Sequence, residues 1–162
     1  MREHVKKNSS ENVVYCDESG FLETIFNPYG WSPRGRKIYG DKDGKRSKRI
    51  NLIMAQRDKK WLAPVLFEGS CDALLVEEWF KNHLFKELKK SSLIIMDNAP
   101  FHRKKKLHEI AENHQHKILF LPSYSPDFNP IEKTFGFMKK RRLYAAKGTT
   151  LETIVMDKNY LE

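Results

Sequence analysis

The 162-residue sequence has few cysteines and no long hydrophobic run. Its two cysteines, Cys16 and Cys71, lie far apart and lack CxxC spacing, which argues against a disulfide framework and against a zinc knuckle. The longest aliphatic stretches, such as residues 93–96, are far shorter than the roughly 20 residues that span a bilayer. The N-terminal residues include positive charges but no apolar segment of the kind found in secretory signals. We therefore expect a cytoplasmic protein that does not bind membranes.

Acidic residues are the minority charge, with 21 Asp and Glu against 30 Lys and Arg and a formal net charge of +9. Three clusters, within residues 34–49, 103–106 and 139–142, hold 16 of these basic residues. Any single cluster can be a solvated helix face or loop, but three in one chain favour a phosphate-binding surface and a nucleic-acid partner. Affinity should then fall steeply with salt. The candidate DNA-binding residues are Arg34, Arg36, Lys37, Lys45, Arg46, Lys48, Arg49, Arg103, Lys104, Lys105, Lys139, Lys140 and Arg141.

The hydrophobic pattern predicts an α/β fold with a mixed sheet and flanking helices. Strands are expected at residues 12–17, 50–55, 61–67, 93–96 and 118–121. Helices are expected after Asp72, over 103–114, from Asn129 to about Arg142, and within 148–162. Strands and helices alternate in the second half, which indicates parallel strands there, whereas the first three strands suit an antiparallel meander. Residues 20–47, rich in glycine, proline and charge, predict a long loop or flexible hairpin.

Two helix starts carry capping residues. Asp72 can cap a helix on which Val76, Phe80, Leu84 and Leu88 recur every four residues as one apolar stripe. The later sequence Asn-Pro-Ile-Glu at 129–132 has the pattern of a capping box, with the asparagine as N-cap and the glutamate three residues on.

Three acidic residues form a candidate catalytic site. Asp17 and Asp97 directly follow apolar runs, which predicts that both lie at the carboxyl ends of strands, where open sheets bind ligands. Glu132, in the first turn of a helix, could complete the set. Three oxygen ligands without a nearby cysteine suit Mg²⁺ or Mn²⁺, and two such ions can assist phosphodiester displacement. Three simpler explanations stay open: a turn at Asp97–Asn98, an ordinary strand-end carboxylate at Asp17, and a helix cap at Glu132.

The sequence around these acids resembles a known family. The three segments are Asp17-Glu18-Ser19-Gly20, Met96-Asp97-Asn98-Ala99-Pro100-Phe101-His102, and residues 121–132 with Asn129-Pro130-Ile131-Glu132 at their end. They are similar to the catalytic blocks of mariner-like transposases, in particular the bacterial insertion-sequence branch. The first two acids have 79 residues between them and the last two have 34, and this second spacing fits the family's Asp-Asp-Glu pattern. The resemblance covers roughly residues 12–145, and all three blocks occur in order.

The resemblance implies a ribonuclease-H-like fold and a DNA transposase. It implies that Asp17, Asp97 and Glu132 coordinate two Mg²⁺ (or Mn²⁺) ions, that water cleaves a transposon-end phosphodiester, and that the freed 3′-hydroxyl attacks target DNA, commonly at TA. The expected partners are transposon-end and target DNA with a second copy or the other half of a split transposase, in the bacterial cytoplasm. Two alternatives remain: a structure-specific or RNA–DNA nuclease of the same fold, and a catalytically idle DNA-binding or dimerisation fragment.

Several neighbours of the acids are candidate supporting residues. Asn98 could orient Asp97 or merely complete a turn, and His102 could contact phosphate or pack locally. Asn129 is expected to cap its helix in either case. Trp31 and Gly35 lie in a stretch that resembles a family block after the first strand, where they could contact DNA or a second subunit; a loop anchored by one buried aromatic residue is the alternative.

The family resemblance also raises the question of a DNA-reading region. Members normally carry an N-terminal helix-turn-helix region, whereas 16 residues precede Asp17 here. We therefore expect a single catalytic domain over residues 1–162, with a basic insertion at about 20–49 and no helix-turn-helix. Such a chain would be the second half of a frameshift-split transposase or a decayed copy.

Overall fold

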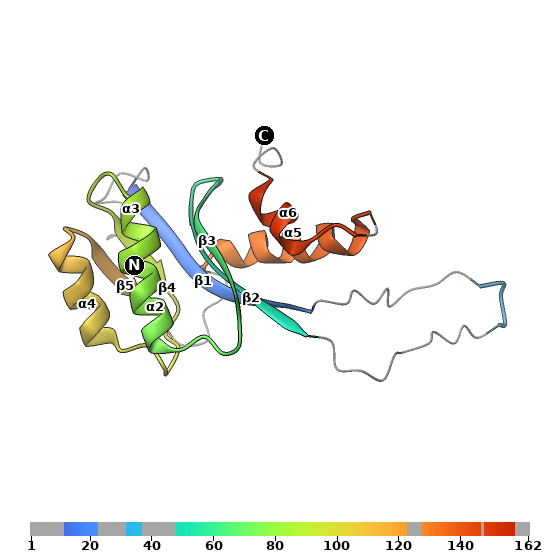
Figure 1. Ribbon diagram of the computed structural model, residues 1–162, viewed down its shortest axis with the longest axis horizontal. Coiled ribbons are helices and arrows are strands. Elements are labelled where there is room, and N and C mark those ends of the chain that lie inside the picture. Colours follow the sequence, from blue (N-terminus) through green and yellow to red (C-terminus); the bar gives the residue numbers. More distant parts are fainter. Residues whose placement is uncertain (1–11, 23–31, 37–47, 123–127, 147, 158–162) are drawn as a thin grey trace.

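The protein folds around one five-stranded mixed sheet (Figure 1). A computed structural model describes residues 12–22, 32–36, 48–122, 128–146 and 148–157. The strands are β1 (Val13–Leu22), β2 (Arg49–Arg57), β3 (Lys60–Glu68), β4 (Leu93–Met96) and β5 (Lys117–Phe120). Their order is β3-β2-β1-β4-β5, antiparallel among the first three strands and parallel from β1 through β4 to β5. The predicted mixed sheet, with its opening meander, is confirmed.

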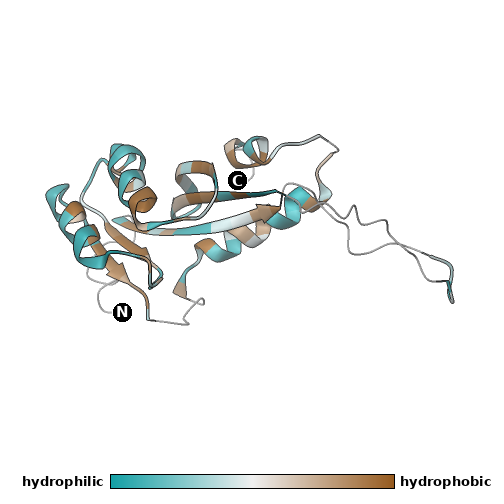
Figure 2. Ribbon diagram, turned by 60° about the horizontal axis from the view of Figure 1, so that its bottom comes forward, coloured by the Kyte–Doolittle hydropathy of each residue, from teal (hydrophilic) through white to brown (hydrophobic). Residues whose placement is uncertain are grey.

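Helices cover both faces of the sheet. The segments α2 (Ala73–Trp79), η2 (Phe80–Leu84) and α3 (Phe85–Glu87) run consecutively and share one core with α4 (Lys104–Asn113). The helices α5 (Ile131–Tyr144) and α6 (Leu151–Met156) build a second core against β1 and β2. Figure 2 shows hydrophobic residues concentrated on the short strands and a mixture of hydrophobic and hydrophilic residues on the helices. The result is a three-layer α/β/α arrangement, as alternating strands and helices predict.

The helix after β3 follows its predicted pattern closely. The Asp72 side chain accepts a hydrogen bond from the Leu75 amide at 2.8 Å and so caps α2. Val76, Phe80 and Leu84 are completely buried. The sequence does not reveal that the middle of this helical run, η2, is a π-helical turn. A single π-helical turn has i→i+5 hydrogen bonds within an otherwise α-helical run, and over so short a stretch the spacing of apolar residues does not distinguish it from an α-helical turn.

The first strand is longer than the sequence predicts. Its parallel pairing with β4 covers only residues 13–15, but its antiparallel pairing with β2 continues to Leu22, opposite Arg49. The predicted loop therefore begins later than residue 20. Gly20 lies under the Arg49 guanidinium, and a Cβ at this position would require that flexible side chain to shift.

Within the predicted insertion, the structure describes the ends that join β1 and β2, and also residues 32–36. Residues 32–36 form a turn closed by a bond from the Arg36 amide to the Pro33 carbonyl at 3.1 Å. Gly35 has a φ of +89°, a value that favours glycine. The predictions for Trp31, Lys37, Lys45 and Arg46 lie outside the described residues. None of the described helices has the length and hydrophobicity needed to cross a membrane.

Candidate active site

The sheet register brings the first two acids to the same level on neighbouring strands. Val13 pairs with Leu93, and Tyr15 with Ile95 is the last pair, so Asp17 and Asp97 each follow this pair by two residues. The position of Asp17 corrects the prediction, because it lies inside β1 rather than at its end. It nevertheless lies just beyond the last pair with β4, at the carboxyl side of the parallel strands. This is also where the sheet changes from antiparallel to parallel pairing, the region in which open sheets bind ligands.

Asp17 is placed on the face of the sheet that α5 covers. It pairs directly with Met54 of β2, and Met54 packs in the same core as Ile131 of α5. Directly paired residues point to the same face. The Asp17 carboxylate accepts the Glu18 amide at 2.8 Å through Oδ1 and the Asn129 Nδ2 amide at 3.4 Å through Oδ2.

The surroundings of Asp17 disfavour its charge. The pKa of Asp17 is raised from 3.8 to about 8, first by burial and then by the negative charges of Glu18, Asp97 and Glu132, against the lowering effect of the Glu18 amide. The contributions of Asp97 and Glu132 indicate that the three predicted acids share one electrostatic site. Near neutral pH, a site of this kind either retains a proton or attracts a cation.

Asp97 is held in place by a histidine and remains accessible. His102 Nε2 lies 3.0 Å from Asp97 Oδ1, and the Ala99 amide lies 3.4 Å from the same oxygen. The His102 side chain is only 1% exposed, whereas that of Asp97 is 45% exposed. Asn98 lies half-buried in the same turn. The histidine therefore fixes one carboxylate oxygen, while solvent or a ligand can still reach the aspartate.

The predicted capping box at α5 is wrong. The residue preceding the helix is Pro130, and no side chain caps the first turn. Asn129 is 3% exposed and directs its Nδ2 to Asp17, while its buried Oδ1 has no hydrogen-bond partner in the described part of the chain. Only the Asn129 backbone carbonyl serves the helix, accepting the Glu132 amide at 3.2 Å. The asparagine side chain therefore links α5 to the acidic site, and Glu132 is exposed at the start of the helix.

Two further residues belong to this site but were not predicted. Burial and the charge of Asp97 raise the pKa of Glu18, while His102 lowers it. The pKa of Cys71 rises to about 12 because it is buried and lies near Glu18, Asp72, Asp17 and Asp97. Glu18 could have been predicted as part of the site from its position directly after Asp17 in the sequence. The sequence has no signal for Cys71, because the loop after β3 brings it to the acids only in the folded chain.

The donor chemistry of the site suits a hard divalent cation. Asp17, Asp97 and Glu132 offer anionic oxygens, and Asn129 Oδ1 is a buried acceptor without a partner in the described residues. The same described segments contain no group of three His, Cys, Asp or Glu side chains close enough to hold a metal ion. Mg²⁺, however, is commonly bound by only one or two carboxylates with water and substrate phosphate. The residues therefore fit such an ion without forming a closed protein cage.

Some predicted DNA-binding residues are occupied by other contacts. Arg103 makes a two-pronged ion pair with Glu77, at 2.7 and 2.8 Å, and Arg141 lies 2.8 Å from Asp157. Arg34, Arg36, Lys48, Arg49, Lys104, Lys105, Lys139 and Lys140 are exposed. DNA contact by any of these residues stays a prediction.

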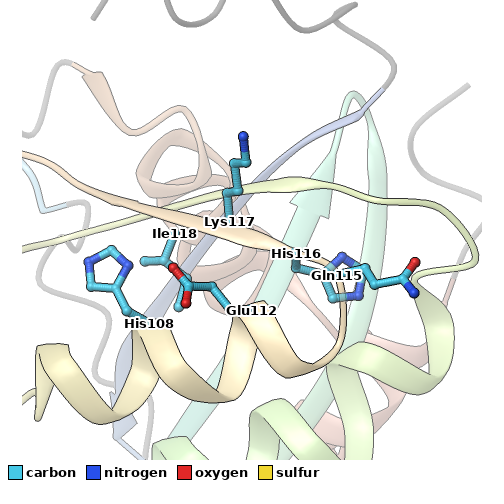
Figure 3. A pocket seen from close by; sticks show the side chains of 6 residues that line it. All are labelled: His108, Glu112, Gln115, His116, Lys117 and Ile118. Carbon is cyan, nitrogen blue, oxygen red and sulfur yellow. The ribbon is translucent and has the colours of Figure 1, made fainter.

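A small hollow lies at the other end of the parallel strands. Its volume is about 380 Å³, and Figure 3 shows it between α4 and the start of β5. Its lining residues are His108, Glu112, Gln115, His116, Lys117 and Ile118. Because Lys117 begins β5 while Asp97 follows the parallel strand β4, the hollow lies at the amino ends of the strands, away from the acids. It is therefore separate from the candidate active site.

Comparison with known proteins agrees with this architecture. A protein-family model described as "DDE superfamily endonuclease" matches residues 12–155. No curated protein matches the sequence.

Solved structures of Mos1 transposase are similar in fold. The Mos1 strand transfer complex gives a TM-score of 0.74 at 18% identity over 94% of this chain and 48% of that chain. The Mos1 mariner paired-end complex with Mg gives a TM-score of 0.74 at 16% identity and covers 95% of this chain and 48% of that chain. The catalytic domain of Mos1 mariner transposase gives a TM-score of 0.63 at 16% identity and covers 94% of this chain and 71% of that chain. The protein thus has the ribonuclease-H-like fold of that domain and spans about half the length of the Mos1 chains in the complexes.

Proposed function

Because the chain belongs to the DDE superfamily endonucleases, we propose that it is a transposase catalytic domain that cleaves DNA and joins the freed 3′-hydroxyl to target DNA. The observation that carries the proposal is that Asp97 and Glu132 both raise the pKa of Asp17. Asp17 and Asp97 each follow the last parallel pair of their strands by two residues, which supports a shared site. Neighbouring acids disfavour the ionised form of a structural carboxylate, whereas a bound cation offsets their mutual repulsion.

The three acids are the proposed ligands of Mg²⁺ or Mn²⁺, in a pair of ions. Relatives of the same fold were solved with Mn and with Mg in paired-end complexes. When bound, such ions lower the pKa of water and stabilise the developing charge on phosphate oxygens. The chain's own contribution is positional. His102 fixes Asp97, and Asn129, two residues before α5, fixes Asp17.

The proposed substrates are transposon-end and target DNA. Mos1 structures include complexes with a transposon end and a strand transfer complex. In this chain, the support comes from the net charge of +9 and from the exposed Asp97 carboxylate. We further propose one catalytic domain over residues 1–162, acting as a homodimer or with the other half of a split transposase in the bacterial cytoplasm. A target preference for TA and membership of the bacterial insertion-sequence branch are part of the same proposal.

One alternative has a specific observation in its favour. Since no three ligand side chains among the described residues lie close enough to hold a metal ion, the domain could be an idle fragment that binds DNA without cleaving it. Such a fragment would retain DNA after substitution of all three acids.

A plasmid assay separates the two functions. Supercoiled plasmid and a 3′-hydroxyl oligonucleotide are incubated with the protein and Mn²⁺, and nicking and oligonucleotide joining are measured. We expect both activities in the wild type and neither in Asp17→Asn, Asp97→Asn or Glu132→Gln. Glu112→Gln, an exposed acid on α4, is the matched control and should remain active. Equal nicking by the wild type and Asp97→Asn would contradict the proposal, and DNA retention with no nicking by the wild type or any variant would support the idle fragment.

A further inference from the structure

The outward face of α5 carries exposed aromatic side chains that its fold does not require. Phe137 is 45% exposed and Tyr144 is 74% exposed, whereas Phe135 on the same helix is 4% exposed. The core side of α5 is already supplied by Ile131, Phe135 and Met138. Single exposed hydrophobic residues are common on protein surfaces, but two aromatic residues aligned on one helix form a surface that can bind a ligand.

These aromatic residues alternate with lysines along one row. Lys133, Phe137, Lys140 and Tyr144 follow the spacing i, i+4, i+7 and i+11 within α5, and all four are exposed. At 3.6 residues per turn they fall within a sector roughly 60° wide and extend about 16 Å along the axis. The buried residues of α5 lie on the opposite side. We name these four residues the aromatic–lysine row.

The charges of the row are available to a ligand. Glu132 is the only acid in α5, whose sequence is IEKTFGFMKKRRLY. Lys133 and Lys140 are in no ion pair found among the described residues, whereas Arg141 on the same helix pairs with Asp157. The row therefore presents two aromatic rings and two positive charges to solvent. An anionic ligand with flat, stackable faces complements this combination of groups.

We propose that the aromatic–lysine row binds an unpaired DNA strand, with bases stacked on Phe137 and Tyr144 and phosphates near Lys133 and Lys140. Duplex DNA offers phosphates, but its base faces are covered by stacking, so the rings distinguish a single strand from a duplex. Glu132 immediately precedes the row on the same helix, roughly 100° away around the axis. A strand separated at the cleavage site can therefore reach the row. The inference rests on the proposed function in taking DNA as the ligand.

Fluorescence anisotropy without divalent metal tests the proposal. The probes are a labelled oligothymidine of about 20 nucleotides and a duplex of the same length, long enough to cover one binding site. In Phe137→Ala/Tyr144→Ala, we expect the dissociation constant for oligothymidine to rise at least roughly tenfold, because stacking contributes substantially for each base. Duplex binding should change by less than about twofold, since phosphate contacts dominate it. Phe137→Trp/Tyr144→Trp should retain single-strand binding.

Two controls keep the result specific. Leu74→Ala removes another exposed hydrophobic side chain, 62% exposed on α2, and should leave both affinities unchanged. Lys133→Ala/Lys140→Ala should weaken the binding of both probes and make their affinity less dependent on salt concentration. Because all these side chains are exposed, each variant should keep the wild-type circular dichroism spectrum and unfolding midpoint.

An unchanged oligothymidine affinity in the double alanine variant would overturn the inference. If that variant also falls from dimer to monomer in light scattering, the row is assigned to a second copy of the chain. The binding assay uses no metal and leaves Asp97 intact, so its failure is distinguishable from a failure of plasmid nicking, which would contradict the proposed function alone.

Discussion

Replacing Asp17 by asparagine should stabilise the metal-free protein at neutral and alkaline pH. The wild-type carboxylate is buried among other acids, which raises its pKa from 3.8 to about 8. Asparagine keeps the shape and the acceptor oxygen but has no charge to bury. The variant therefore removes the unfavourable ionisation without creating a cavity.

The expected magnitude follows from the difference in proton binding between the folded and unfolded states. Below the unfolded pKa of 3.8 both states hold the proton, and the contribution of this group to stability is fully present. Between about pH 4 and 8 the unfolded state ionises while the folded state keeps its proton, so stability is lost as pH rises towards the folded pKa. At about 1.4 kcal/mol per pH unit, the loss between pH 5.5 and 8 is roughly 3 kcal/mol.

Urea unfolding in EDTA measures this difference directly. The free energy of unfolding is determined for the wild type and Asp17→Asn between about pH 5.5 and 9, where the predicted change occurs. Other groups that titrate in this range affect both proteins equally, so their difference isolates Asp17. Glu112→Gln, an exposed acid, should follow the wild-type curve.

Divalent metal provides a second readout for the same experiment. Mg²⁺ or Mn²⁺ that binds the ionised site should stabilise the wild type at pH 8 and leave Asp17→Asn nearly unaffected. Parallel pH curves for the two proteins would refute the reasoning, because they would mean that the Asp17 carboxylate is solvated in the folded protein.

Three further predictions concern buried side chains elsewhere in the fold. Arg103→Ala leaves the buried Glu77 carboxylate unpaired and should lower the free energy of unfolding by roughly 2–3 kcal/mol, as measured in urea, with Glu77→Gln restoring part of the loss. Trp79→Phe removes the 2.7 Å bond from Nε1 to the Ala63 carbonyl and should cost about 1–2 kcal/mol in thermal unfolding. Burial lowers the pKa of His116, so the stabilisation by this side chain is present above about pH 6.5 and is lost as pH falls. In urea unfolding, the free energy of unfolding of His116→Gln should therefore depend less on pH between about pH 5 and 7 than that of the wild type.

Local patterns were sufficient to predict most of the secondary structure. Short apolar runs became strands, and the four-residue spacing of Val76, Phe80 and Leu84 became a buried helix face. The end of β1 could not be predicted in this way. Pairing with β2 continues the strand to Leu22, and such a partner lies far away in the sequence. Strand length depends on this long-range pairing as well as on composition.

Charged and polar side chains were harder to place because their partners are set by tertiary structure. The sequence around Asn129 fits a capping box, yet its side chain bonds Asp17, which precedes it by 112 residues. Arg103 belongs to a basic cluster, yet its guanidinium is held by Glu77. A local motif describes what a side chain can bond, and the fold decides which available partner it meets.

The corresponding positions of Asp17 and Asp97 on neighbouring strands could be inferred because they depend on a regular feature of parallel strands. Asp17 lies four residues after Val13, Asp97 lies four residues after Leu93, and Val13 pairs with Leu93. Equal distances from one aligned pair bring two residues to the same level, because neighbouring parallel strands rise by nearly the same amount per residue. This argument requires only the start of each apolar run and the adjacency of the strands. Glu132 approaches from α5, so its place depends on helix packing over the sheet, which the register does not determine.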